Sequence, residues 1–203
     1  MANLREAQKR MTRRLLLEAG LELFKAKGYA ATTVDDIATA AGTTRVTFYA
    51  YFSSRSELMK ALIDEQLNDV LQRVGSPEHG STAQDLVATV VDGTPEAITA
   101  WLRRTAQSWP AIRPIIRLGR DAAVIEPELT DLVEQWMAEA ISDIEDGLET
   151  AGRFQPHQRY FRGVLAMAQL DFVAQNWEGA DWKLTRDQML EELAASWVGL
   201  LTA

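Results

Sequence analysis

Two short helical segments separated by a glycine lie near the start of the chain. Apolar residues at helical spacing predict the first segment over residues 34–41 and the second over about 45–51. Gly42 stands between them, and glycine readily takes the left-handed backbone conformation that a tight turn requires. Ala38 and Ala41 are small enough to let two helices cross closely. The segment therefore predicts a helix-turn-helix whose second helix is exposed on one face.

Helical patterns also cover most of the remaining chain. One amphipathic helix starts at about Leu4 or Thr12 and runs to Lys27, and another starts near Ser54. No stretch of useful length alternates between apolar and polar residues as a half-buried strand does. Further helices are predicted over residues 83–91, 95–108, a short segment bracketed by Pro110 and Pro114 to about 120, 127–151, 158–177 and 186–201. We therefore expect an all-α fold of nine to ten helices.

Domain boundaries follow from these segments. We expect a three-helix helix-turn-helix domain over residues 1–54 and a larger helical domain over residues 55–203. Within the larger domain, residues 75–81 (GSPEHGS) consist of turn formers without an apolar side chain, which is typical of a linker.

Charge is distributed unevenly along the chain, whose net charge is −8. The first 60 residues contain ten Lys or Arg and six Asp or Glu, a net charge of +4, so the remainder carries −12. A basic end on an acidic body can present one face to nucleic-acid phosphates. Charge scatter without a function is the alternative.

The basic residues from Arg5 to Arg14 leave two alternatives open. They are either an arm near DNA or a solvated, disordered tail.

Several classes of protein are disfavoured. The absence of cysteine excludes disulfides, thiolate catalysis and cysteine zinc sites. No apolar run is long enough to span a membrane, and the polar, basic start lacks a signal-peptide core, so we expect a cytoplasmic protein. Neither His79 nor His157 follows a glutamate at the spacing of helical di-iron sites. Phosphate-binding and nucleophile-elbow motifs are absent, so we expect neither catalysis nor a cofactor or metal.

The exposed face of the second short helix carries side chains that suit DNA. Hydroxyls and a guanidinium cluster near its start, and phenols follow. Because arginine can pair bidentately with guanine, Arg45 is the favoured base contact, although a phosphate contact is an equal alternative. For Tyr49 and Tyr51 the alternative is packing in a small core. The candidate DNA-binding residues are Thr33, Thr43, Thr44, Arg45, Thr47, Tyr49, Tyr51 and Arg55.

The stretch from Leu16 to Leu62 resembles the amino-terminal domain of the TetR family of bacterial regulators. The matching strings are TVDDIATAAG from Thr33, TTRVTFYAYF from Thr43 and RSEL from Arg55. Two positions depart from the family pattern: Val46 stands where a very small residue is usual, and Arg55 where lysine is usual. Beyond this stretch, only length and helical character agree with the family.

The resemblance implies a role for individual residues. Thr33 would cap the second helix and contact a phosphate. Thr43, Thr44, Arg45 and Thr47 would face the major groove, while Tyr49, Tyr51 and Arg55 would hold the DNA backbone. A homodimer would place two recognition helices in successive major grooves, about 34–36 Å apart, on a near-palindromic operator.

The resemblance also implies that the larger domain binds a small-molecule effector and dimerises. All six tryptophans lie after residue 100, which indicates a helical core or an apolar effector pocket. Polar Asp171 and Gln175 in an apolar helix need partners, which could be a ligand, another helix or a second subunit. The candidate pocket residues are Trp101, Trp109, Trp136, Met137, Asp171, Phe172 and Gln175. The candidate dimer residues are Ala166, Leu170, Leu190, Leu193, Ala194, Trp197 and Leu201.

The function that this resemblance implies is a ligand-responsive transcriptional regulator, in the simplest case a repressor that a small hydrophobic molecule releases from DNA. Activation is the alternative outcome. The competing classes are an enzyme built on a helical bundle and a helical interaction module that does not bind DNA.

Overall fold

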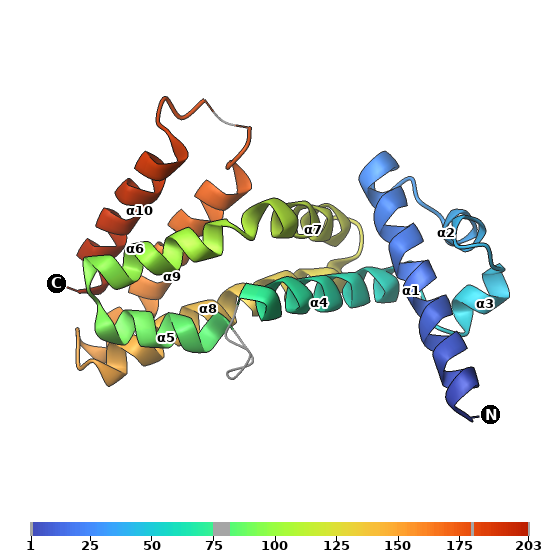
Figure 1. Ribbon diagram of the computed structural model, residues 1–203, viewed down its shortest axis with the longest axis horizontal. Coiled ribbons are helices and arrows are strands. Elements are labelled where there is room, and N and C mark those ends of the chain that lie inside the picture. The colour runs from blue at the N-terminus through green and yellow to red at the C-terminus, as the bar shows by residue number, and fades with distance from the viewer. Residues whose placement is uncertain (1, 75–81, 180, 203) are drawn as a thin grey trace. The chain divides into compact units, whose positions relative to one another are not determined.

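The computed structural model of the protein describes residues 2–74, 82–179 and 181–202 (Figure 1). These residues form ten α-helices and one short 3-10 helix and contain no strand, so the all-α prediction is confirmed. The predicted linker at residues 75–81 lies outside the described residues. The helices are α1 (Ala2–Lys27), α2 (Val34–Ala40), α3 (Arg45–Tyr49), α4 (Arg55–Val74), α5 (Thr82–Asp92), α6 (Pro95–Ala106), α7 (Trp109–Ala123), η1 (Pro127–Leu129), α8 (Thr130–Thr150), α9 (Pro156–Gln175) and α10 (Arg186–Leu201).

One helix departs from its predicted bounds because of its prolines. The expected short helix was bracketed by Pro110 and Pro114, whereas α7 begins at Trp109 and contains Pro114. Pro110 lies in the first turn, where a helix needs no amide donor. Pro114 removes only the bond to the carbonyl of residue 110, and the helix continues past it.

The chain divides into two compact units. Unit 1 contains Met1–Leu67 and Pro114–Val133, and unit 2 contains Asn68–Arg113 and Glu134–Ala203. These units do not coincide with the predicted ranges 1–54 and 55–203. The difference arises because the first part of α4 and the segment from Pro114 to Val133 pack with the amino-terminal helices.

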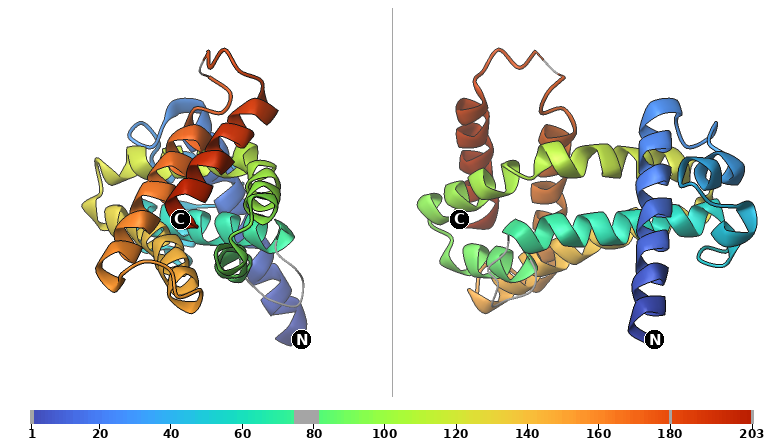
Figure 2. Two further views of the ribbon diagram at one scale, coloured as in Figure 1. Left: turned by 90° about the vertical axis from the view of Figure 1, so that its left-hand side faces the viewer. Right: turned by 45° about the vertical axis from the view of Figure 1, so that its right-hand side comes forward.

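The core of unit 1 forms where α1 packs against α2 and α4 (Figure 2). Leu16, Phe24, Ile37 and Leu58 are fully buried there. The approach of α1 to α4 is close, since a Cβ atom on Gly20 would lie 2.7 Å from Cδ2 of Leu58. These contacts fix the frame that carries α2 and α3.

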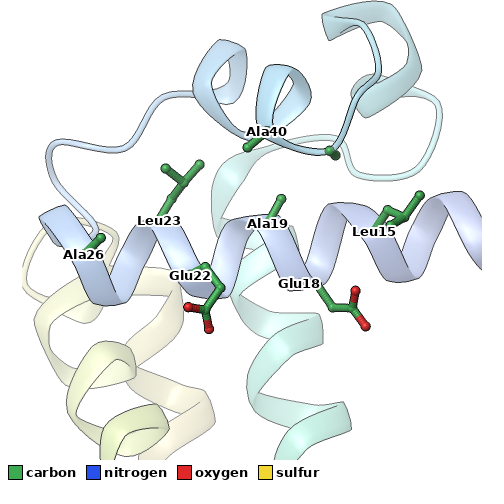
Figure 3. A pocket seen from close by; sticks show the side chains of 8 residues that line it. Leu15, Glu18, Ala19, Glu22, Leu23, Ala26 and Ala40 are labelled. Carbon is green, nitrogen blue, oxygen red and sulfur yellow. The ribbon is translucent and has the colours of Figure 1, made fainter.

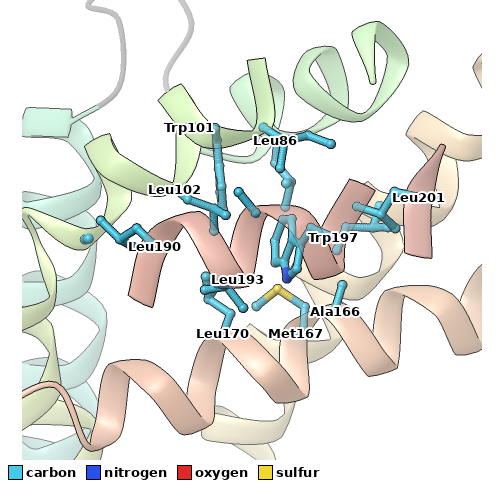
Figure 4. Close-up of a cluster of buried hydrophobic side chains, with 14 of the residues drawn as sticks. Leu86, Trp101, Leu102, Ala166, Met167, Leu170, Leu190, Leu193, Trp197 and Leu201 are labelled. Carbon is cyan, nitrogen blue, oxygen red and sulfur yellow. The ribbon is translucent and has the colours of Figure 1, made fainter. Parts of the chain in front are cut away.

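The core of unit 2 forms around α10, whose inner face packs between α6 and α9 (Figure 4). Trp197 is fully buried and stacks on Trp101 with ring centroids 5.4 Å apart. Trp109 meets Trp177 edge to face at 4.8 Å. Large aromatic side chains therefore fill the interior of this unit.

Candidate nucleic-acid interface

A reciprocal capping box starts α2. The Thr33 hydroxyl accepts a hydrogen bond from the Asp36 amide at 3.1 Å, and the Asp36 carboxylate accepts one from the Thr33 amide at 2.8 Å. Lys27 Nζ lies 2.7 Å from the same carboxylate. Hydrogen bonds from Lys27 and Thr33 hold the pKa of Asp36 well below its ordinary value. The expectation that Thr33 caps the second helix is thus confirmed.

A tight turn joins α2 to α3. Gly42 has a φ of +66°, in the left-handed region that glycine adopts without steric cost. The Thr43 amide donates to the Ala38 carbonyl at 2.9 Å, which closes the turn. The turn brings Thr43 and the start of α3 to the same exposed edge.

The helix α3 is short and is anchored by one fully buried side chain. Phe48 packs against Phe52 with ring centroids 5.8 Å apart. Thr44 caps the helix, because its hydroxyl accepts from the Thr47 amide at 3.2 Å. The Thr44 and Thr47 hydroxyls also lie 3.0 Å apart and share a hydrogen bond. Thr44 is exposed and Thr47 is half-buried, and their hydrogen bond lies at the surface, where another partner can replace it.

Arg45 lies along one side of α3. Its Nη1 donates to the Asp35 carboxylate at 3.0 Å, and its Nη2 lies 3.4 Å from the Tyr49 hydroxyl. The Tyr49 hydrogen bond and the Asp35 charge raise the pKa of Arg45 above its ordinary value. Because exposed ion pairs contribute little to stability, a phosphate or base could replace Asp35 as the partner of Arg45.

The remaining side chains of this surface differ in exposure. Tyr49 is exposed and Tyr51 is half-buried, so the phenol of Tyr49 is the more accessible. Val46 is 80% exposed, although it is apolar. The structure therefore brings the exposed Arg45, Val46 and Tyr49 together with the half-buried Thr43 and Thr47 at the turn and the start of α3.

Arg55 is placed differently from the expectation that it holds the DNA backbone. Its side chain is 20% exposed, and its Nη1 donates to the carbonyls of Tyr29 at 3.0 Å and Thr32 at 2.7 Å. Its Nη2 lies 3.3 Å from Glu126 Oε1, and the guanidinium covers the Tyr29 ring at 4.0 Å. Burial of Tyr29 raises the pKa of its phenol. The guanidinium of Arg55 is thus occupied by hydrogen bonds to residues of unit 1.

Sequence reasoning missed the partners of Arg55. Glu126 is distant in sequence, so no local pattern could have identified it. The arginine itself was a signal for several internal acceptors, because a planar guanidinium can donate to several oxygens at once, whereas a lysine ammonium is a single compact charge.

The basic residues before Arg14 belong to α1, which contradicts the alternative of a disordered tail and leaves the arm near DNA as a prediction. Arg5, Lys9 and Arg10 are exposed on its first turns. Arg13 pairs with Glu65 and lies over the Phe52 ring at 5.2 Å. Arg5, Lys9 and Arg10 thus belong to an exposed helical segment at the start of α1.

A shallow groove of about 540 Å³ runs between α1 and the end of α2 (Figure 3). Leu15, Ala19 and Leu23 point toward α2, whereas the carboxylates of Glu18 and Glu22 point away from it. The groove is lined by small apolar groups and bordered by acids, which would repel phosphate. It is therefore unsuited to the DNA backbone.

The predicted effector-pocket residues that the structure describes differ in burial and in neighbours. Trp101 and Trp109 are buried against Trp197 and Trp177. Phe172 is 61% exposed and meets Trp182 edge to face. The other candidates are Met137, packed against the core, Asp171 and Gln175, both half-buried, and Trp136, whose side chain lies outside the described part. The candidates thus differ in burial among the described residues, and the effector pocket stays a prediction.

The predicted dimer residues face inward. All seven are buried in the core of unit 2, from Leu170 at 6% exposed to Trp197 at 0%. Side chains enclosed within one chain cannot form a seam with another, so this expectation is corrected. The opposite face of α9 instead exposes an apolar stripe, named here the outer α9 stripe. It consists of Phe161, Leu165, Ala168 and Phe172.

The described residues offer neither a metal site nor a membrane span. No group of three His, Cys, Asp or Glu side chains is arranged to hold a metal ion. No helix among those described combines the length and apolar character that crossing a membrane requires.

Comparison with known proteins agrees with the geometry of unit 1. Residues 16–62 match the family of bacterial regulatory proteins named tetR. The regulator TtgR of Pseudomonas putida is 40% identical over 75 residues, which cover 36% of this chain and 35% of TtgR. The matches to TtgR and to similar amino-terminal relatives thus span about a third of those proteins' length.

Two comparisons extend over nearly the whole chain. The transcriptional repressor DhaR of a Mycobacterium species is 27% identical over 183 residues, covering 89% of this chain and 86% of DhaR. The crystal structure of NalD, the secondary repressor of a multidrug efflux pump in Pseudomonas aeruginosa, superposes with a TM-score of 0.68 at 19% identity. That superposition covers 96% of this chain and 97% of NalD. Together with the helix-turn-helix geometry, these matches show that residues 16–62 are similar to the amino-terminal domain of bacterial regulatory proteins of the tetR family, and that the whole chain shares its fold with NalD.

Proposed function

We propose that the protein is a transcriptional regulator that binds duplex DNA through α3 and the turn before it. The observation that carries this proposal is the exposed face of α3, which Phe48 anchors from behind and which presents hydroxyls and a guanidinium. A short exposed helix of this kind fits the major groove. DhaR and NalD are both named as repressors, which supports repression as the outcome.

The proposed DNA contacts fall into two groups. Thr43, Arg45 and Thr47 face the base edges, and Tyr49 and Tyr51 contact the phosphates. Thr33 and Thr44 act mainly as helix caps, with the adjoining backbone amides available to phosphates. Arg55 stabilises unit 1 through its internal hydrogen bonds and does not contact the DNA backbone.

We propose that two copies associate through the outer α9 stripe. Its members recur at helical spacing on the face of α9 opposite the buried Ala166 and Leu170. On α10, Ala195 and Gly199 are also exposed, and small residues permit close approach of helices. Such a dimer would present two copies of α3 to a near-palindromic operator.

We also propose that unit 2 binds a small hydrophobic effector in the cytoplasm. The aromatic and methionine content of its interior supports an apolar ligand. The effector can release DNA only if it binds one conformation more tightly than the other.

The test is fluorescence anisotropy of the purified protein on DNA from the region flanking its own gene, with a scrambled duplex and varied salt. The expected result is sequence-selective binding that weakens as salt rises. Replacing both Arg45 and Thr47 by alanine should abolish selectivity while the dimer persists. Arg104→Ala, an exposed arginine in unit 2, is the matched control and should bind normally. Unchanged binding by the double variant would overturn the proposal.

If the flanking DNA shows no selectivity, selection from random duplexes is the next step. Failure to enrich any sequence there would favour a helical interaction module without DNA binding. Hydrophobic small molecules can be screened for release in the same assay once an operator is known.

A further inference from the structure

The exposed apolar side chain in the first turn of α3 packs against no core of the protein. Val46 is 80% exposed, whereas the neighbouring anchor Phe48 is fully buried. Successive helical residues are about 100° apart, so Val46 lies on the side of α3 opposite Phe48. The isopropyl group therefore projects from the middle of the face proposed to enter DNA.

Polar groups lie on both sides of this side chain. On one side, Arg45 is drawn toward Asp35 and Tyr49 by its hydrogen bonds. On the other, the Thr47 hydroxyl pairs with Thr44. These contacts hold the polar side chains of Arg45 and Thr47 on the two sides of Val46. The isopropyl group therefore projects between them into solvent.

Valine also suits recognition by shape. A β-branched side chain has one strongly preferred χ1 rotamer in a helix, so little conformational entropy remains to be lost on contact. An exposed isopropyl group gains free energy only when it meets another apolar group. Among major-groove base edges, the C5-methyl of thymine is the apolar group available.

We propose that Val46 contacts the C5-methyl group of a thymine in each operator half-site and so selects that base. This inference rests on the proposed function, because it assigns a base contact within the same interface. It predicts that the operator contains a T·A pair at one fixed position of each half-site. Arg45 then contributes at a neighbouring position or to the backbone.

The test uses deoxyuridine, which differs from thymidine only in lacking the C5-methyl group. An operator is first selected from random duplexes with the wild-type protein. Each thymine is then replaced by uracil, at matching positions of both half-sites, and affinity is measured by anisotropy. Removing one buried methyl contact per half-site should weaken binding by about 4-fold each, or roughly 15-fold for the pair.

The variants identify the side chain responsible. Val46→Ala should bind the thymine and uracil operators with equal affinity at the sensitive position. Val124→Ala is the matched control, because Val124 is also a valine of unit 1 and is 86% exposed. It should keep the full wild-type sensitivity. Circular dichroism checks that both variants keep their helical content.

The outcomes separate this inference from the proposed function. An operator that is selected but tolerates uracil at every position overturns the inference alone. The same follows if Val46→Ala keeps the sensitivity of the wild type. A protein that selects no sequence at all overturns both.

Discussion

Arg55 donates a hydrogen bond to the carboxylate of Glu126 across 3.3 Å, although 71 positions separate the two residues. The contact joins the start of α4 to the turn after α7 within unit 1. Together with the Tyr29 and Thr32 carbonyls, Glu126 supplies Arg55 with acceptors that one ammonium group could not reach equally well. The segment from Pro114 to Val133 is thus held against the amino-terminal helices by hydrogen bonds of Arg55 as well as by apolar packing.

The first prediction concerns the hydrogen bonds of Arg55. Arg55→Ala should lower the free energy of unfolding by about 2 kcal/mol, because two buried carbonyls and Glu126 lose their donor. Arg55→Lys should recover part of the loss. Both are measured by denaturant unfolding at fixed protein concentration, with Arg104→Ala as a control. Equal stability of Arg55→Ala and wild type would show that the network contributes nothing.

The position of Arg55 illustrates what the sequence could and could not predict. Helix starts were predictable where the signal is local: the Thr33 cap and the start of α10 at Arg186 both follow from capping residues. The division into units was not, because it depends on contacts such as that between Arg55 and Glu126. No periodicity within α4 or α7 reports such a pairing.

The buried stripe of α10 illustrates a second limit. Leu190 and Trp197 recur at helical spacing, which indicates an apolar face but not the chain that covers it. The interior of unit 2 covers that face, and the outer α9 stripe is left exposed. The apolar pattern therefore located the buried face of α10 correctly, whereas the family resemblance assigned that face to a second subunit.

The second prediction tests the corrected role of Trp197. Trp197→Ala should lower the free energy of unfolding by about 3–5 kcal/mol, because a fully buried ring that stacks on Trp101 is removed. Among the described residues, no acceptor lies within reach of Trp197 Nε1. Trp197→Phe should therefore cost less, since it keeps an aromatic ring and removes an unsatisfied donor. Denaturant unfolding at constant concentration distinguishes the two variants. A cost for Trp197→Phe as large as that for Trp197→Ala would contradict this account.

The third prediction tests the outer α9 stripe. Phe161→Glu combined with Phe172→Glu should yield monomers, because the carboxylates would lose hydration in an apolar seam. Tyr160→Glu is the control: Tyr160 is also exposed on α9 but lies off the stripe. Sedimentation velocity measures the oligomeric state. A dimer that survives the double change would place the seam elsewhere.

The fourth prediction concerns acid. Hydrogen bonds from Lys27 and Thr33 depress the pKa of Asp36, so its contribution to stability is present above the unfolded-state pKa and is lost as pH falls toward the folded-state value. Wild type should therefore be more stable than Asp36→Asn at pH 7. The difference should shrink as pH falls below about 4. Thermal unfolding from pH 7 to pH 2 measures it, and a difference independent of pH would argue against the capping carboxylate as its source.

The fifth prediction concerns the ion pair that Arg45 makes in the absence of DNA. Asp35 places a carboxylate beside the proposed recognition surface and binds the guanidinium at 3.0 Å. Asp35→Asn removes both the competition for Arg45 and the repulsion of nearby phosphates, so affinity for the selected operator should rise several-fold. Asp121→Asn makes the same charge change at an exposed position on α7 in unit 1 and should have a smaller effect. If the two variants gain equally, net charge rather than release of Arg45 explains the change. If Asp35→Asn binds more weakly, the ion pair instead orients Arg45 for its base or phosphate.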